Sequence, residues 1–110
     1  MISRYANSAY RVYLNSDSQI SSGSSYFSLN TWTHVAATYN GNLLSLYING
    51  ELVGTKEMTT TLQSTATFVV GSRGTGTLGN TYASTPLKGY VNDARYYDHC
   101  LSAAEVKEIA

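Results

Sequence analysis

The sequence predicts an all-β domain of antiparallel hairpins, closed by a short C-terminal helix. Its composition suits a pleated, half-buried surface, with ten Tyr, many Ser and Thr, and a single Pro. Two Asn-Gly dipeptides separate strand-like apolar runs, and a helix-capping sequence lies near the end of the chain. At 110 residues the chain has the size of one domain with one hydrophobic core.

The clearest local signals are the dipeptides Asn40-Gly41 and Asn49-Gly50. Strand-like runs flank them at residues 32–39, 43–48 and 51–56. Asn-Gly between apolar runs is typical of a type I′ hairpin turn, because both turn positions need positive φ. The sequence therefore predicts a three-stranded meander. Within it, Leu44, Leu46 and Ile48 share one face, which we assign to the core.

Further strands are expected on both sides of this meander. Their strand-like runs cover residues 9–14, 19–22, 66–70 and 87–97. The last run alternates imperfectly, and its apolar residues share a face only if a bulge falls near Asn92-Asp93. Residues 72–85 form a long loop rich in Gly, Thr and Ser, and long ordered loops in compact domains are often functional.

A capping box marks the start of the C-terminal helix. Ser102 occupies the N-cap position and Glu105 the third helical position. Leu101 and Val106 stand where a hydrophobic staple places its two apolar residues. These positions predict a helix from about Ala103 to the end of the chain.

Charge, hydropathy and cysteine content argue against nucleic-acid binding, membrane insertion, a disulfide and a Cys-based zinc site. Seven basic and seven acidic residues cancel, whereas a nucleic-acid binder needs clustered Lys and Arg to neutralise phosphates. No stretch is long and apolar enough to insert into a membrane, and residues 1–5 lack the apolar core of a signal peptide. Cys100 is the single cysteine, so neither an intrachain disulfide nor a Cys-based zinc site is expected.

Two blocks of sequence carry a family resemblance. Residues 32–41 read WTHVAATYNG and residues 46–54 read LYINGELVG. Residues 87–106 read LKGYVNDARYYDHCLSAAEV. In order and spacing these blocks resemble the laminin-G-like jelly rolls of the concanavalin A-like lectin/glucanase superfamily. The chain is similar to about the C-terminal two-thirds of such a domain and lacks some of its N-terminal strands.

The resemblance implies a two-sheet antiparallel sandwich that serves as an extracellular adhesion or glycan-binding module. Such modules are often attached to glycosidases, surface proteins or phage tail proteins, so an extracellular or virion-associated location is expected. A jelly roll without its outer strands exposes strand edges, which pair readily with another chain. We therefore expect a homo-oligomer or a partner chain that supplies the missing strands.

The residues do not predict an enzyme. Glycoside hydrolysis needs two carboxyl groups a few ångströms apart, and no two acids alternate on an expected strand. Asp93 and Asp98 would lie on opposite faces of an unbroken strand. His99 and Cys100 are neighbours in sequence, which does not make a catalytic dyad in space. Residues 74–79 match GxGxxG, but no helix is predicted after them to hold a pyrophosphate.

A sugar site needs an aromatic face together with fixed polar groups. The long loop offers Arg73, Asn80 and Tyr82, while Asp17 and Tyr26 lie in or beside the upstream loops. We interpret these five residues as ligand-binding. The alternative is that Tyr is simply abundant and that loop Asn residues shape turns. Calcium is the one metal that the resemblance suggests, because family members often bind it through loop acids and carbonyls. Asp17 is the only loop acid placed for it, and one carboxylate gives too few ligands for a hard cation, so no metal or other cofactor is expected.

The resulting hypothesis is a non-catalytic carbohydrate- or surface-recognition module of the lectin-like adhesion type, acting through loops at one rim. Its partner would be a glycan or another cell-surface ligand. The alternative is a structural or assembly module of a phage tail or surface protein, without a small ligand of its own. Asp93 and Arg95 match a pair that recurs in the family, and we expect them to hydrogen-bond the end of the sheet near the helix.

Overall fold

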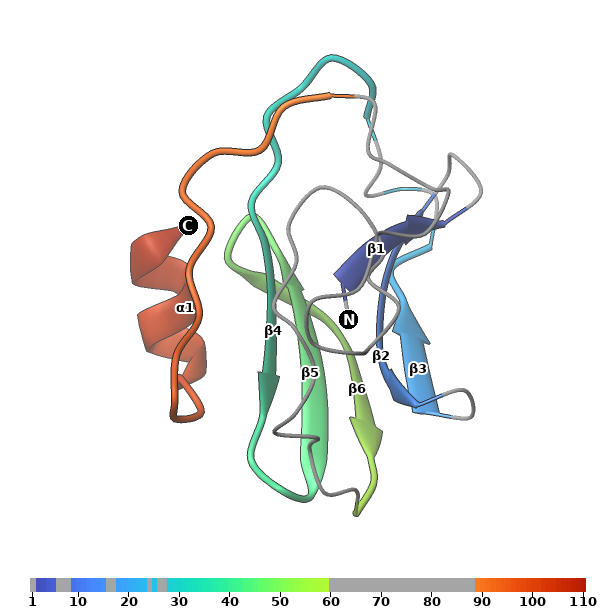
Figure 1. Ribbon diagram of the computed structural model, residues 1–110, viewed down its shortest axis with the longest axis vertical. Helices are drawn as coiled ribbons and strands as arrows, with labels where there is room; N and C mark the ends of the chain where they lie inside the picture. Colours follow the sequence, from blue (N-terminus) through green and yellow to red (C-terminus); the bar gives the residue numbers. More distant parts are fainter. Residues whose placement is uncertain (1, 6–8, 16–17, 24, 26–27, 60–88) are drawn as a thin grey trace, which may run out of the picture. The chain divides into compact units, whose positions relative to one another are not determined.

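The computed structural model describes residues 2–5, 9–15, 18–23, 25, 28–59 and 89–110. These residues form the strands β1 (Ile2–Tyr5), β2 (Ala9–Asn15), β3 (Ser18–Ser21), β4 (Val35–Tyr39), β5 (Leu43–Ile48) and β6 (Glu51–Glu57) and the helix α1 (Ala103–Ile109) (Figure 1). All of them belong to one compact unit, residues 1–61 and 97–110. A second unit spans residues 62–96, of which 89–96 are described, so the strand predicted at 66–70 lies outside the described residues.

The strands form two antiparallel three-stranded sheets, in the orders β1-β2-β3 and β4-β5-β6. Each strand pairs with its neighbour in the chain, so both sheets are built from consecutive hairpins. The strands predicted at 9–14 and 19–22 are confirmed as β2 and β3. Strand β1, which pairs Ile2 with Val12, was not predicted, because four residues are too few to show a clear alternation.

The β5–β6 hairpin has the two-residue turn that its sequence predicts. Ile48 pairs with Glu51, and Asn49 and Gly50 between them adopt φ values of 51° and 82°. A type I′ turn needs positive φ at both positions, and Asn and Gly tolerate this conformation better than other residues. The prediction for this dipeptide is therefore confirmed.

The β4–β5 hairpin is confirmed, but its turn is not the predicted two-residue type. Tyr39 pairs with Leu44, and only Gly41 of the Asn-Gly pair has positive φ (97°). The Asn40 side-chain oxygen accepts the backbone N–H groups of Asn42 and Leu43, at 2.9 and 2.7 Å. Asn40 therefore shapes a longer connection with its side chain, as Asn commonly does in turns.

The hydrophobic core lies between the two sheets. Leu44, Leu46 and Ile48 are at most 3% exposed, which confirms the predicted core face. They pack in one cluster with Val12 and Ile20 of the first sheet. Burial of apolar side chains from both sheets holds the sheets together as a sandwich.

Gly54 brings the two sheets into close contact. It pairs with Leu46, and a Cβ atom at this position would lie 2.6 Å from Cγ2 of Ile20. The pairing register shifts beside it, so that β6 carries one extra residue, Val53, which packs against the core. This β-bulge directs Val53 inward next to the position where the sheets approach each other.

Helix α1 begins with the predicted capping box. The Ser102 hydroxyl oxygen accepts the Glu105 N–H at 3.2 Å, and the Glu105 carboxylate accepts the Ser102 N–H at 3.0 Å. Val106 is fully buried, as its position in the predicted staple requires. Within the described ranges no helix has the length and apolarity to cross a membrane.

The C-terminal part of α1 packs on the β5–β6 turn. A Cβ atom on Gly50 would lie 3.1 Å from Cβ of Ala110 and 3.2 Å from Cα of Lys107. Figure 1 shows α1 on the side of β4-β5-β6 that faces away from β1-β2-β3. The second sheet is therefore covered on one face by the first sheet and on part of the other by the helix.

The predicted strand at 87–97 is wrong for the residues that the structure describes. Residues 89–97 belong to no strand. Asp93 has a φ of 55°, a left-handed conformation that interrupts an extended backbone. The interruption falls at the position where the sequence required a bulge.

Gly54→Ala should lower the free energy of unfolding by about 1–3 kcal/mol, because the added methyl group overpacks against Ile20. Denaturant unfolding measures this difference. Ile20→Leu moves the branch from Cβ to Cγ, so Gly54→Ala should cost less in that background. Thr55→Ala, at the exposed neighbouring position, is the control and should cost less. An equal cost of Gly54→Ala in both backgrounds would contradict the contact.

Gly50→Ala should destabilise the protein more than Gly41→Ala. Both glycines have positive φ, so each substitution should cost about 1–2 kcal/mol of backbone strain. Only Gly50 has neighbours within 4 Å of the added Cβ atom, in the backbone and side chains of α1. The difference in unfolding free energy between the two variants measures the helix contact, and no difference would argue against it.

Candidate functional site

The five residues interpreted from sequence as ligand-binding lie outside the described residues. They are Asp17, Tyr26, Arg73, Asn80 and Tyr82. Their contact with a ligand stays a prediction.

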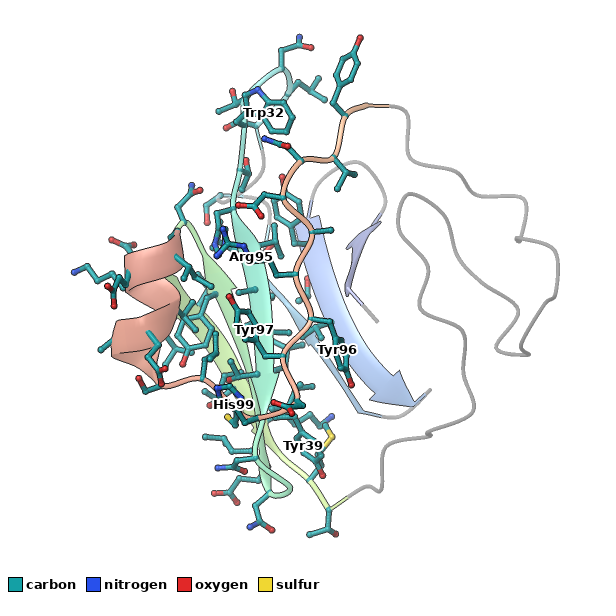
Figure 2. The ribbon with its side chains drawn as sticks, turned by 60° about the vertical axis from the view of Figure 1, so that its left-hand side comes forward. Trp32, Tyr39, Arg95, Tyr96, Tyr97 and His99 are labelled. Carbon is teal, nitrogen blue, oxygen red and sulfur yellow. The ribbon has the colours of Figure 1, made fainter. Side chains whose placement is uncertain are left out.

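Among the described residues of the first unit, the most exposed aromatic side chain is that of Trp32, which precedes β4. The sequence predicted a strand from residue 32, but β4 begins at Val35. Residues 28–34 therefore form a connection, which we call the Trp32 loop. Leu29 and Asn30 lie in a turn within it, with Asn30 at a φ of 53°. Figure 2 shows Trp32 beyond the N-terminal end of β4.

Two large apolar side chains of the Trp32 loop face solvent. Trp32 is 70% exposed and Leu29 is 68% exposed. A Trp side chain carries a large apolar ring and is on average highly buried in folded proteins. Exposed apolar groups gathered in one loop therefore mark a candidate contact surface.

Polar groups of the Trp32 loop shape its backbone. The Thr31 hydroxyl donates to the Leu29 carbonyl at 3.1 Å, and the Thr33 hydroxyl donates to the Thr31 carbonyl at 3.4 Å. Each hydroxyl oxygen keeps lone pairs that can accept further hydrogen bonds. Residues 28–34 include no Asp, Glu, Lys or Arg. The loop thus presents an aromatic ring beside hydroxyl and amide groups, without a formal charge.

Asn49 holds the C-terminal end of the Trp32 loop. Its Oδ1 atom accepts the backbone N–H of His34 at 2.9 Å, and its own N–H donates to the His34 carbonyl at 2.8 Å. The Nδ1 atom of His34 is buried and has no hydrogen-bond partner among the described residues. The β5–β6 turn therefore fixes the residue two positions after Trp32 through its backbone.

A second group of side chains, made of Tyr97, Asp98 and His99, lies just before α1. Figure 2 shows Tyr97 and His99 of this group. Nδ1 of His99 lies 3.0 Å from Oδ1 of Asp98, and the Tyr97 ring meets the imidazole edge-on at a centroid distance of 6.0 Å. The hydrogen bond from His99, and then its charge, lower the pKa of Asp98. The Asp98 side chain is 97% exposed, so water screens the pair strongly.

The described residues include no cluster that could hold a metal ion, and they include one free thiol. No three His, Cys, Asp or Glu side chains gather among them in a way that could hold a metal ion. Cys100 is an exposed free thiol, whose Sγ donates weakly to the Leu101 carbonyl at 3.6 Å. Neither feature adds a reactive group to the Trp32 loop.

In the second unit, Asp93 and Arg95 bind each other. The Arg95 Nε and Nη2 atoms donate to the two carboxylate oxygens of Asp93, both at 2.8 Å. This two-point geometry is the strong form of an Arg–carboxylate pair. The expected contact of the pair with the end of a sheet stays a prediction.

Sequence reasoning did not single out Trp32 as a ligand-binding candidate, because it placed that residue inside a strand. The composition of residues 28–33, which read SLNTWT, gives only a partial signal. Ser28 and Asn30 favour a turn because their side chains bond their own backbone, whereas Thr31, Trp32 and Thr33 suit a strand. The sequence therefore did not exclude a strand that includes Trp32.

Comparison with known proteins identifies relatives of the fold. A laminin-G-type family model, described as the concanavalin A-like lectin/glucanases superfamily, matches residues 1–107. No curated protein matches the chain.

Among solved structures, the chain is similar to an S-layer domain-containing protein (residues 221–444) from Clostridium thermocellum ATCC 27405. The two are 29% identical, with a TM-score of 0.61, over 92% of this chain and 51% of that one. The chain therefore spans about half the length of the solved chain that it matches.

The helix cap should be sensitive to acid. The backbone N–H of Ser102, and then its hydroxyl, lower the pKa of Glu105 below the ordinary 4.5. Because the folded-state pKa is lowered, the stabilisation is present above the unfolded-state value and is lost as the pH falls through the folded-state value. An NMR titration of the Glu105 carboxyl group should give a pKa below 4.5, with α1 fraying as that group protonates.

Two substitutions at the N-cap refine this expectation. Ser102→Ala removes the hydroxyl but keeps the backbone N–H, so it should raise the pKa of Glu105 part of the way to its ordinary value. Ser102→Thr keeps the hydroxyl and serves as the control. A Glu105 pKa at or above 4.5 in the native chain would show that the cap does not form in solution.

Proposed function

The chain belongs to the concanavalin A-like lectin/glucanase superfamily, and on this basis we propose that it is a non-catalytic recognition module whose ligand is a glycan. The observation that carries the proposal is the exposed Trp32 ring on an uncharged loop. A flat aromatic face packs against the apolar C–H groups of a sugar, while hydroxyl and amide groups bond its hydroxyls. The Trp32 loop provides both kinds of group on one short segment.

The family and the solved relative both indicate a surface-associated module. The relative is an S-layer domain-containing protein, at 29% identity over 92% of this chain. We propose that the present chain likewise acts outside the cell, where glycans of a cell surface or matrix are available as ligands.

Two carboxyl groups, Asp98 before α1 and Glu105 in its first turn, lack the property that the general acid of a glycosidase needs. A glycosidase needs a general acid whose pKa is raised, so that it still holds its proton near neutral pH. The environments of Asp98 and Glu105 lower their pKa values instead. Both groups would be ionised at neutral pH and could not protonate a leaving sugar.

The alternative function is that of a structural or assembly module in a surface protein. The similarity to an S-layer domain-containing protein favours this alternative. In that case Trp32 and Leu29 would contact a neighbouring protein and not a sugar. The two functions differ in what binds to the same loop, so one set of variants can separate them.

A glycan array should show reproducible binding by the native chain, and Trp32→Ala should abolish it through loss of the stacking face. Trp32→Phe keeps a smaller ring and should retain part of the binding. Leu52→Ala removes an exposed apolar side chain of β6 that lies outside the loop, so it should bind as the native chain does. Silence of the native chain across the array would favour the assembly role over glycan recognition.

A further inference from the structure

We infer that the Trp32 loop binds an uncharged pyranose ring by stacking on Trp32, and that it does so without a metal ion. This inference rests on the proposed function and deepens it, because it names the class of sugar and the residues that contact it. Three properties of the loop lead to it: its charge, its exposed ring and its anchored end.

The charge of the loop selects against acidic sugars. Carboxylate and sulfate groups are commonly recognised by Arg or Lys, which form short charge-assisted hydrogen bonds with them. Residues 28–34 contain neither Arg nor Lys. They also contain no Asp or Glu, the carboxylates that commonly hold a bridging calcium ion. The contacts that remain are stacking and neutral hydrogen bonds, which suit an uncharged sugar.

The exposed ring supplies the stacking face. Trp32 is 70% exposed, so most of its apolar area is open to a ligand. A pyranose ring has an apolar C–H face, and burial of that face against the indole removes apolar area of both partners from water. The Thr31 and Thr33 hydroxyls already donate to backbone carbonyls. Their free lone pairs can therefore accept hydrogen bonds from sugar hydroxyls.

The anchored end makes the loop ready for binding. Asn49 exchanges two hydrogen bonds with the backbone of His34, at 2.9 and 2.8 Å. A loop held in this way loses less conformational entropy when a ligand binds. Asn49 is therefore a positioning residue, which acts through His34 and does not contact the sugar.

The chain contains its own reporter for this inference. Trp32 is the single tryptophan, so tryptophan emission reports on this loop alone. The free chain should show the emission of a solvent-exposed indole, readily quenched by iodide. Cello-, manno-, xylo- or chito-oligosaccharides should shift the emission to shorter wavelength and protect it from iodide for at least one of the series. The shift should persist in EDTA and in high salt, and sulfated or sialylated sugars should not bind better than their neutral parents.

Variants separate contact from positioning. Trp32→Ala should lower the affinity measured by calorimetry at least about tenfold, which corresponds to about 1.4 kcal/mol. Asn49→Gly keeps a residue that tolerates positive φ but removes the side-chain acceptor, so it should lower the anisotropy of Trp32 emission and weaken binding a few-fold. Asn49→Asp retains an acceptor and should restore both. A merely structural role of Asn49 would not change the local anisotropy of Trp32.

The outcomes are distinguishable. Emission typical of a buried indole in the free chain, or a shift that depends only on protein concentration, would mean that protein covers Trp32 and would overturn the inference. Array binding without any change in Trp32 emission would overturn it as well but leave glycan recognition in place. Loss of the shift in EDTA, or a preference for acidic sugars, would overturn the assignment of ligand class. Absence of binding to any glycan would overturn both the inference and the proposed function.

Discussion

The structure of the first unit depends on one two-residue reversal, Asn49-Gly50. The left-handed backbone at both positions joins β5 to β6 in register. The Asn49 side chain and backbone hold His34 at the entrance to β4. The missing side chain of Gly50 leaves room for the last turn of α1. This turn therefore joins β5 to β6 and contacts the entrance to β4 and the end of α1. Its local geometry constrains parts of the chain that are far apart in sequence.

The sandwich gives this arrangement a rigid base. Leu44 and Leu46 close the space between the sheets from one side and Ile20 from the other, while Gly54 allows a separation that any side chain would prevent. Close-packed interiors of this kind deform little. Exposed groups at the ends of the strands are therefore held in defined positions by the core, which would allow the short, uncharged Trp32 loop to act as the recognition surface that we propose.

Features encoded by local chemistry could be predicted from the sequence. The capping box at Ser102 and Glu105, the Asn49-Gly50 turn and the inward face of β5 each follow from a few adjacent residues, and the structure has all three. Predictions were wrong where the backbone conformation depends on which of several local hydrogen bonds one side chain makes. The Asn40 side chain accepts two backbone N–H groups that follow it, so the β4–β5 turn is longer than predicted. Asp93 adopts a left-handed conformation inside an expected strand. The exposure of Trp32 could not be predicted from the sequence. It depends on where β4 begins and on what packs around the loop, and both are tertiary properties.

The double role of Asn49 limits which amino acids can replace it. Glycine accepts the backbone conformation but has no acceptor for the His34 N–H, and Ser or Thr supply an oxygen but enter the left-handed region at a cost. Asn and Asp are the side chains that meet both demands. Among distantly diverged members of the superfamily, an Asn or Asp at this point of the β5–β6 turn would therefore identify chains that tie down the entry to β4 in the same way. Any other residue there would indicate that the segment before β4 is free to vary in shape, and with it the surface that the domain offers to its surroundings.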